Sequence, residues 1–237
     1  MTTERANLAF TGIPTFGRAP LVTDLAAIQA DVAVLGVPFD EGVSFRPGTR
    51  YGPRAIRDLS CRFSFFSLET RRGYYDLERQ ERLLTGLRVV DAGDVDILYM
   101  APERNFALMT DAIRRIVATG AMPLTLGGDH SISFPLVRGL EALGPIGVVQ
   151  LDAHLDYRDH FHGVRLGHGS PMRRISELGF VRQMASLGIR GLRTNEEDVN
   201  AALAKGHVIV TSRELHRIGV EEALARIPLM ERCYVSL

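Results

Sequence analysis

Residues 146–156 read IGVVQLDAHLD, an almost continuous apolar run that leads directly into two aspartates and a histidine. Continuous rather than alternating apolar residues are typical of strands buried on both faces of a parallel sheet. Comparable runs recur along the chain, each followed by a turn and a segment whose apolar spacing suits a helix packed on a sheet. We therefore predict strands at 31–39, 87–92, 122–126, 146–151, 184–189, 207–211 and 233–237, and helices at 52–63, 102–118, 131–143, 170–178, 195–204 and 220–227.

This alternation of strands and helices predicts the fold class. Each strand–helix–strand return should be right-handed, which makes the connected strands parallel. We expect an α/β fold with three layers, αβα, in which helices cover both faces of a mostly parallel sheet. The chain shows no internal repeat or linker, and the irregular stretch 64–85 is the only long segment that looks like an insertion. Residues 1–237 are therefore interpreted as a single domain.

The composition argues against several classes of partner. Of the 237 residues, 46% are hydrophobic and 24% are charged, which suits one globular domain with a sizeable core. Lys plus Arg and Asp plus Glu number 28 each, so no net charge attracts nucleic acid or an anionic membrane. The N-terminus lacks a continuous apolar signal region, and no stretch approaches the length of a membrane span. We expect a cytoplasmic protein that binds a small molecule and neither nucleic acid nor membrane.

Two polar clusters stand where predicted strands end, which is where open parallel sheets bind ligands. Asp152 and His154 are two residues apart and should project the same way, Asp156 follows at the turn, and His130 can join them from another strand. Carboxylates mixed with imidazoles favour Mn²⁺, with Zn²⁺ or Fe²⁺ also open. The alternative is a solvated turn that caps the next helix. With only two cysteines, far apart in sequence, a thiolate site or disulfide framework is not expected.

Some neighbouring residues allow two interpretations. Asp129 can hold a ligand imidazole or cap the helix near residue 131. His160 and His162 can line the mouth of a site, although a solvated loop is favoured. The two glycines at 127–128 do not match the phosphate-loop patterns. A close approach of another backbone segment explains them better. Structural ion pairs are favoured over a binding role for Arg46, Arg50, Arg54 and Arg57.

Several motifs carry a family resemblance. They are GGDHS at 127–131, DAHLD at 152–156 and HGSPMRR at 168–174, extended by GVPFDEGVSFRPGTRYGPRAIR at 36–57 and DAGDVDI at 91–97. Through them the sequence resembles the ureohydrolase family of arginases and agmatinases, and the last two stretches look closer to agmatinases. The resemblance covers most of the chain and implies an arginase-like form of the expected α/β fold.

The resemblance also implies a binuclear metal site and a reaction. His130 and Asp156 would bind one Mn²⁺, His154 the other, and Asp152 both, giving two Mn²⁺ per subunit. Two ions about 3.5–4 Å apart can activate a shared water for hydrolysis. Asp156 would orient that water and take its proton, while His168 would pass protons toward the leaving amine. The alternative for His168 is a histidine that caps the helix from residue 170.

The substrate implied is a small guanidino compound, and the reaction is C–N hydrolysis that releases urea. Agmatine, cleaved to putrescine and urea as in polyamine biosynthesis, is the first expectation. A guanidino acid such as guanidinobutyrate or guanidinopropionate is the alternative, because Arg158 could favour a substrate carboxylate unless Asp159 neutralises it. A noncatalytic member of the fold is a further alternative. The family also implies a homotrimer or homohexamer.

The third metal motif of the family, Asp-x-Asp, is absent from the sequence. The chain ends at residues 234–237, YVSL, which resemble the strand that leads into that motif. We therefore expect the missing carboxylates just beyond Leu237 and expect the 237-residue chain by itself to be weakly active or inactive.

Overall fold

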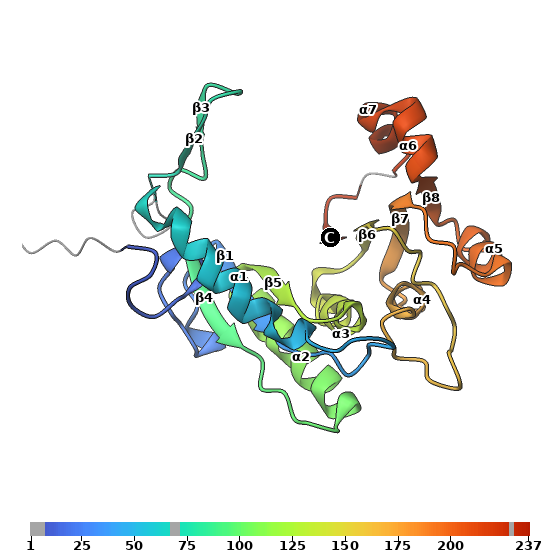
Figure 1. Ribbon diagram of the computed structural model, residues 1–237, viewed down its shortest axis with the longest axis horizontal. Coiled ribbons are helices and arrows are strands. Elements are labelled where there is room, and N and C mark those ends of the chain that lie inside the picture. The colour runs from blue at the N-terminus through green and yellow to red at the C-terminus, as the bar shows by residue number, and fades with distance from the viewer. Residues whose placement is uncertain (1–7, 67–71, 228–229) are drawn as a thin grey trace, which may run out of the picture. The chain divides into compact units, whose positions relative to one another are not determined.

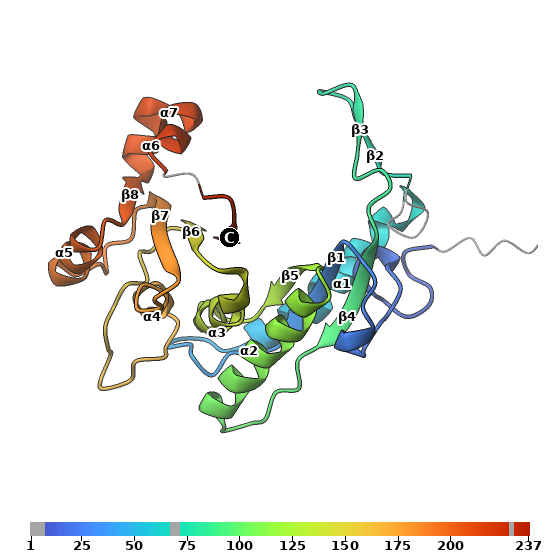
Figure 2. The same ribbon diagram turned by 180° about the vertical axis from the view of Figure 1, so that it is seen from behind.

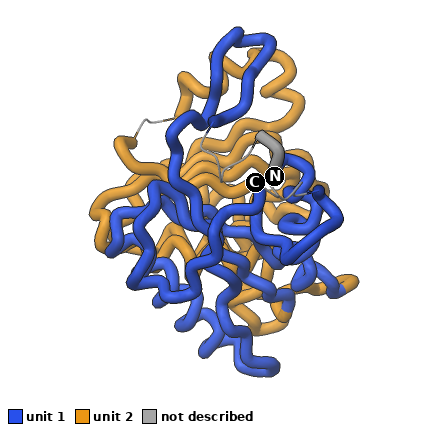
Figure 3. The backbone as a smooth tube through the Cα atoms, turned by 90° about the vertical axis from the view of Figure 1, so that its left-hand side faces the viewer, with its two compact units in different colours: residues 1–40, 47–128 blue, residues 41–46, 129–237 orange. Residues whose placement is uncertain are grey.

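The computed structural model describes residues 8–66, 72–227 and 230–237, without the side chains of 64–66. The chain forms two compact units (Figure 3). The first comprises Met1–Asp40 and Pro47–Gly128, and the second comprises Glu41–Arg46 and Asp129–Leu237. The interpretation of residues 1–237 as a single domain stays a prediction.

The first unit contains a parallel sheet with the strand order β4-β1-β5. Its strands are β1 (Val32–Val37), β4 (Val89–Asp94) and β5 (Met122–Gly127). Helix α1 (Gly52–Ser60) lies in front of this sheet in Figure 1, and α2 (Pro102–Ala118) lies in front of it in Figure 2. The two helices therefore cover opposite faces of the sheet.

Helix α2 shows how the sequence pattern produces this packing. Proline at its first turn costs no hydrogen bond, because the first helical N–H groups have no partner within the helix. Phe106, Met109, Ile113 and Ile116 recur at helical spacing and are all buried. The observed bounds of α2 match the predicted 102–118.

A short hairpin occupies part of the stretch that we expected to be irregular. Strands β2 (Tyr74–Asp76) and β3 (Glu81–Leu83) pair antiparallel. The Asp76 carboxylate accepts hydrogen bonds from the backbone N–H groups of Glu78 and Arg79, which fixes the turn. The expectation is therefore wrong for these residues, whereas 67–71 lie outside the described chain.

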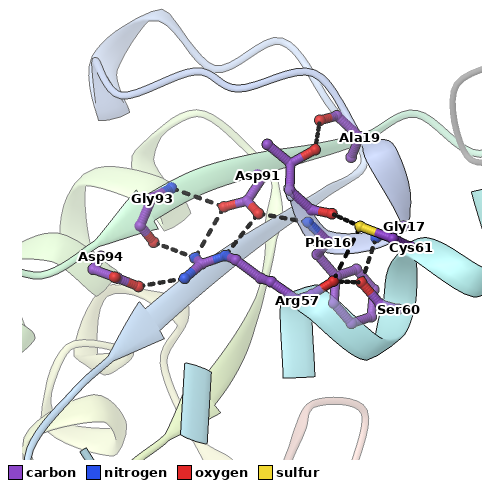
Figure 4. A network of polar contacts seen from close by, with 10 residues as sticks. Phe16, Gly17, Ala19, Arg57, Ser60, Cys61, Asp91, Gly93 and Asp94 are labelled. Carbon is purple, nitrogen blue, oxygen red and sulfur yellow. Dashed lines mark hydrogen bonds and ion pairs between the residues drawn. The ribbon is translucent and has the colours of Figure 1, made fainter. Parts of the chain in front are cut away.

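A buried ion-pair network joins α1 to β4 (Figure 4). Arg57 on α1 donates two hydrogen bonds to Asp91, from Nε at 2.8 Å and from Nη2 at 2.9 Å, and a third from Nη1 to Asp94 at 2.5 Å. Asp91 also accepts the backbone N–H of Phe16 at 2.7 Å, which ties the N-terminal arm to the sheet. Arg50 similarly donates from Nε to Asp40 at 2.6 Å. These contacts confirm the structural role predicted for Arg57 and Arg50.

The second unit contains a parallel sheet with the strand order β8-β7-β6-β9. Its strands are β6 (Ile146–Leu151), β7 (Val181–Ile189), β8 (Val208–Thr211) and β9 (Cys233–Ser236). The bounds of β6 are those predicted, and the parallel α/β class is confirmed. The helices of this unit are α3 (Ser133–Arg138), α4 (Pro171–Ile175), α5 (Glu196–Ala204), α6 (Ser212–Ile218) and α7 (Val220–Ala225).

An apolar cluster holds two of these helices against the sheet. Ala185 and Leu187 of β7 pack with Val210 of β8 and Ala223 of α7, and Leu215 of α6 packs against the same cluster. The sequence reasoning missed α6, although its start is signalled by Thr211-x-x-Glu214, in which the threonine hydroxyl accepts the N–H of Glu214 at 3.2 Å.

Short 3-10 helices complete the described elements. They are η1 (Phe16–Arg18), η2 (Leu25–Ala27), η3 (Thr49–Tyr51), η4 (Cys61–Phe66), η5 (His130–Ile132) and η6 (Glu141–Leu143). We predicted a single helix over 131–143, whereas the structure has α3 flanked by the 3-10 helices η5 and η6. Within the described residues, every helix is too short or too polar to cross a bilayer.

One expectation about burial is wrong. We expected each parallel strand to be covered on both faces, and β1 is buried at every position. In β5, however, Met122 is 59% exposed and Leu124 is 40% exposed. The two side chains are two residues apart and so lie on one face of β5, which is not covered at these positions.

Candidate metal centre

Three of the four predicted metal ligands meet at the end of β6. His130 Nδ1 lies 2.7 Å from Asp156 Oδ2 and 3.7 Å from Asp152 Oδ2. One donor atom from each of the three residues lies within 4.8 Å of the other two. Carboxylates and an imidazole nitrogen that converge in this way suit a borderline divalent ion. The residues therefore fit the metal that the resemblance implies, and their role as ligands stays a prediction.

Backbone geometry explains how Asp156 reaches His130. Asp156 has φ 46°, in the left-handed region that aspartate tolerates better than most side chains. The carbonyl of Asp156 accepts the N–H of Met172 at 3.1 Å, which anchors this turn to the first turn of α4. The loop thus bends back on itself at the residue that supplies the carboxylate.

His154 lies beside this group rather than within it. Its side chain is 60% exposed, and its Nδ1 lies 3.6 Å from Asp152 Oδ1. We expected Asp152 and His154 to project the same way as neighbours on a strand, but β6 ends at Leu151 and the strand alternation ends with it. Asp152 nevertheless has one oxygen 3.7 Å from His130 Nδ1 and the other 3.6 Å from His154 Nδ1.

The second nitrogen of His130 has its own partner. Nε2 lies 3.1 Å from Ser236 Oγ at the end of β9. With Nε2 engaged by the serine, Nδ1 is the atom that faces the carboxylates, and partners of this kind commonly fix the orientation of a ligand imidazole. Sequence reasoning missed Ser236, because only the pairing of β6 with β9 brings it to this end of the sheet.

The segment Glu41–Arg46 links two of the sequence motifs within the second unit. The N–H of Gly42 donates to Asp129 Oδ2 at 2.9 Å, and its carbonyl accepts the N–H of His168 at 3.1 Å. A Cβ at Gly42 would lie 2.7 Å from Ser131 Oγ, so no larger residue fits without displacement. Gly42 was not singled out from the sequence, although it lies in one of the motifs.

His168 lies against this segment and outside the three-residue group. Its Nε2 is 3.2 Å from Ser44 Oγ. The side chain therefore does not cap α4, whose N-cap is Ser170.

Asp129 of the GGDHS motif caps the 3-10 helix η5, because its carboxylate accepts the N–H of Ser131 at 2.8 Å. The alternative in which Asp129 holds a ligand imidazole is not what the structure shows.

The loop after Asp156 carries a cation and a separate ion-pair cluster. Arg158 stacks on the Phe161 ring at 5.0 Å and donates to the carbonyl of Arg193 at 3.3 Å. Asp159 pairs with Arg174, and this hydrogen bond holds the pKa of Asp159 below its usual range. Asp159 therefore has another cation as its main partner and does not neutralise Arg158.

The two loop histidines have local partners. His160 lies beside Asp159, with 3.6 Å between its Nδ1 and a carboxylate oxygen, and its side chain is exposed. The ring of His162 packs edge-on against that of Phe161, with 4.3 Å between the ring centroids. The favoured interpretation, a solvated loop, agrees with these positions.

The sheets are parallel, and carboxylates and an imidazole lie together at the end of one strand. This combination is typical of metal-dependent α/β proteins. This chain belongs to the arginase family, whose model matches residues 30–237. It is 36% identical to guanidinopropionase of Pseudomonas aeruginosa over 219 residues, which are 91% of this chain and 65% of that protein. It is 37% identical to the mitochondrial agmatinase of Gallus gallus over 184 residues, 76% of this chain and 51% of that protein.

The fold agrees with this assignment. The crystal structure of proclavaminate amidino hydrolase from Streptomyces clavuligerus superposes with a TM-score of 0.83 at 29% identity, covering 96% of this chain and 74% of that one. The arginase-like α/β fold is therefore confirmed. The chain spans between 51% and 65% of the length of the two curated relatives named above.

Proposed function

We propose that this chain is part of a metal-dependent hydrolase that cleaves a guanidino C–N bond and releases urea. The observation that carries the proposal is the convergence of His130, Asp152 and Asp156 in a member of the arginase family. The guanidino group is resonance-stabilised, so hydrolysis needs an activated water, stabilisation of developing charge and a proton for the leaving amine.

The donor set favours two divalent ions. His130 and Asp156 would hold one, His154 the other, and Asp152 would be a ligand of both. When bound, such a pair supplies Lewis-acid activation of water and polarises the substrate. The mixture of carboxylates and imidazoles favours Mn²⁺.

The other steps fall to side chains of this chain. Asp156 would orient the attacking water and accept its proton. His168, whose Nε2 lies 3.2 Å from Ser44 Oγ, would deliver a proton to the departing amine.

Two chemistries compete for the other end of the substrate. Agmatine carries an ammonium group there, and the resemblance to an agmatinase supports it. A guanidino acid carries a carboxylate, and two observations support that alternative. Asp159 is paired with Arg174 rather than with Arg158, and the chain is similar to a guanidinopropionase.

The test is urea release by the polypeptide that the gene encodes, loaded with Mn²⁺, across agmatine, guanidinobutyrate, guanidinopropionate and arginine. Asp156→Asn should abolish turnover, and His168→Asn should lower kcat by about 100-fold or more, as expected for a lost general acid. His162→Asn, in the solvated loop, is the matched control and should retain activity. Absence of urea from every substrate would overturn the proposal.

Arg158→Ala separates the two substrate chemistries. If the substrate is a guanidino acid that Arg158 recognises, the variant should lose kcat/KM for the acid while leaving agmatine hydrolysis unchanged. An unchanged preference would remove Arg158 from the argument. We also propose a cytoplasmic homotrimer or homohexamer, for which light scattering of the gene product and cell fractionation are the tests.

A further inference from the structure

A chain of buried polar side chains runs beneath the metal-ligand loop. Gln150 lies on β6, Ser186 on the neighbouring β7, and His207 directly before β8, and all three are buried. Gln150 Nε2 lies 3.3 Å from Asp152 Oδ2 and 3.0 Å from the carbonyl oxygen of His154. Ser186 Oγ lies 2.6 Å from Gln150 Oε1 and 2.9 Å from His207 Nε2.

The chemistry of the partners fixes the direction of each hydrogen bond. An ionised carboxylate and a backbone carbonyl can only accept, so the amide of Gln150 must turn its N–H groups toward Asp152 and His154. Its oxygen then faces Ser186 and must accept the hydroxyl proton. Because a hydroxyl has a single proton to donate, His207 Nε2 must carry the proton in the last hydrogen bond of the chain.

The state of His207 agrees with this direction. Burial lowers its pKa to about 4, so the ring is neutral near pH 7 and has one N–H. Its other nitrogen, Nδ1, is buried and has no hydrogen-bond partner among the described residues. Only the tautomer that carries its proton on Nε2 can donate to the Ser186 hydroxyl. That hydroxyl then donates to Gln150 Oε1 and so orients the amide.

Such a chain costs more than an apolar strand interior would, because each buried group needs its partner. Neighbouring buried positions on β6 and β7, including Val148, Ala185 and Leu187, are apolar, so the sheet itself does not require polar residues here. The polar chain leads only toward the loop that carries Asp152 and His154. This placement points to the loop as the reason for the chain.

We propose that Gln150 is a positioning residue for the metal ligands, with Ser186 and His207 holding its amide in the one orientation that fits. A single nitrogen binds both the Asp152 carboxylate and the His154 carbonyl, and the His154 N–H binds the other Asp152 oxygen at 2.9 Å. The segment between the two ligands is thereby held at three points. The inference rests on the metal centre of the proposed function.

Gln150→Glu and Ser186→Ala test the two parts of this chain. The first variant would present a second carboxylate to Asp152 and to a carbonyl, whereas the second frees the Gln150 amide to turn over. Mn²⁺ affinity of the polypeptide that the gene encodes, measured by isothermal titration, should fall by about 10- to 100-fold in Gln150→Glu and by less in Ser186→Ala. The Co²⁺ absorption spectrum should change in both, because it reports ligand geometry rather than stability.

Two further variants give the controls. Ser186→Thr keeps the hydroxyl and should restore the affinity and the Co²⁺ spectrum. Thr211→Ala removes another hydroxyl of the same unit, one that accepts the N–H of Glu214 at 3.2 Å at the start of α6, so it should leave both unchanged. If Gln150→Glu fails to fold, as judged by circular dichroism, the comparison of Ser186→Ala with Ser186→Thr carries the test.

Asp156→Asn separates failure of this inference from failure of the metal centre. If Asp156→Asn abolishes tight Mn²⁺ binding while Gln150→Glu and Ser186→Ala bind Mn²⁺ as the parent does, the centre stands and the positioning role is overturned. If Asp156→Asn leaves the affinity unchanged, the centre is wrong and the positioning role falls with it. Weaker binding and altered Co²⁺ spectra in both chain variants, with the controls unchanged, support the inference.

Discussion

Arg57→Ala should be among the most destabilising substitutions in the first unit. The side chains of Arg57 and Asp91 are 8% and 1% exposed, and the guanidinium makes two hydrogen bonds to the carboxylate. Without Arg57, Asp91 keeps only the backbone N–H groups of Phe16 and Gly93. Removing one partner of a buried pair costs about 3–5 kcal/mol, because the remaining charge is buried without compensation.

The control for this prediction is Arg88→Ala in the same unit. Arg88 also makes paired hydrogen bonds to an aspartate, Asp31, but the two side chains are 48% and 40% exposed. Exposed pairs of this kind contribute little, because solvent screens the two charges. Asp91→Asn combined with Arg57→Ala should recover part of the loss, since the uncompensated charge is gone.

The assay is urea unfolding followed by far-ultraviolet circular dichroism, because the chain has no tryptophan. Hydrogen exchange of the β1 and β4 amides then locates the change in the first unit. If Arg57→Ala costs no more than Arg88→Ala, burial does not govern the strength of this ion pair and the reasoning fails.

Three further predictions concern pH and backbone space. Burial lowers the pKa of His207 to about 4 from 6.5, so stability is lost as pH falls through this window. The loss should be about 2 kcal/mol between about pH 7.5 and about pH 5 by urea unfolding, and an equal slope in His207→Gln would refute it. The Arg50 guanidinium holds the pKa of Asp40 below its usual range, so the stabilisation is present above the ordinary carboxyl pKa and lost as pH falls through the lowered one. Asp40→Asn should therefore destabilise at neutral pH and lose its effect in strong acid, and a cost that persists there would count against the ion pair. Gly128 has φ 71°, and a Cβ there would lie 2.5 Å from the carbonyl oxygen of Val37, so Gly128→Ala should cost more than about 1–3 kcal/mol in thermal unfolding. An unchanged melting temperature would contradict this.

Helices and strands with a strong local sequence pattern were predicted correctly. Continuous apolar residues predicted β6 with its observed bounds, and apolar residues at helical spacing did the same for α2. The Gly128 prediction was also confirmed, because close approach to the backbone of Phe39 and Val37 leaves no room for a side chain. In contrast, α6 and the β2–β3 hairpin were missed, since a capping threonine and an aspartate turn are weaker signals than periodicity.

The sequence predicted one part of the candidate site, and the tertiary structure decided the other. The residue types and spacing of DAHLD and GGDHS predicted which side chains could bind a metal, because ligand chemistry is a property of each residue. Only the tertiary structure decided that His130, Asp152 and Asp156 converge while His154 stands beside them. The end of β6 at Leu151 set that difference, since strand alternation cannot be extended beyond the last paired residue.

The contacts that support the site were decided by topology. Ser236 reaches His130 because β9 pairs with β6, and Ser186 reaches Gln150 because β7 pairs with β6 on the other side. Nothing in the spacing of these residues along the chain marks them as partners. The sequence by itself determined the family, the parallel α/β class and the chemistry of the ligands, because these depend on local residue patterns. Strand order determined which distant side chains orient those ligands, because it is set by packing between segments far apart in sequence.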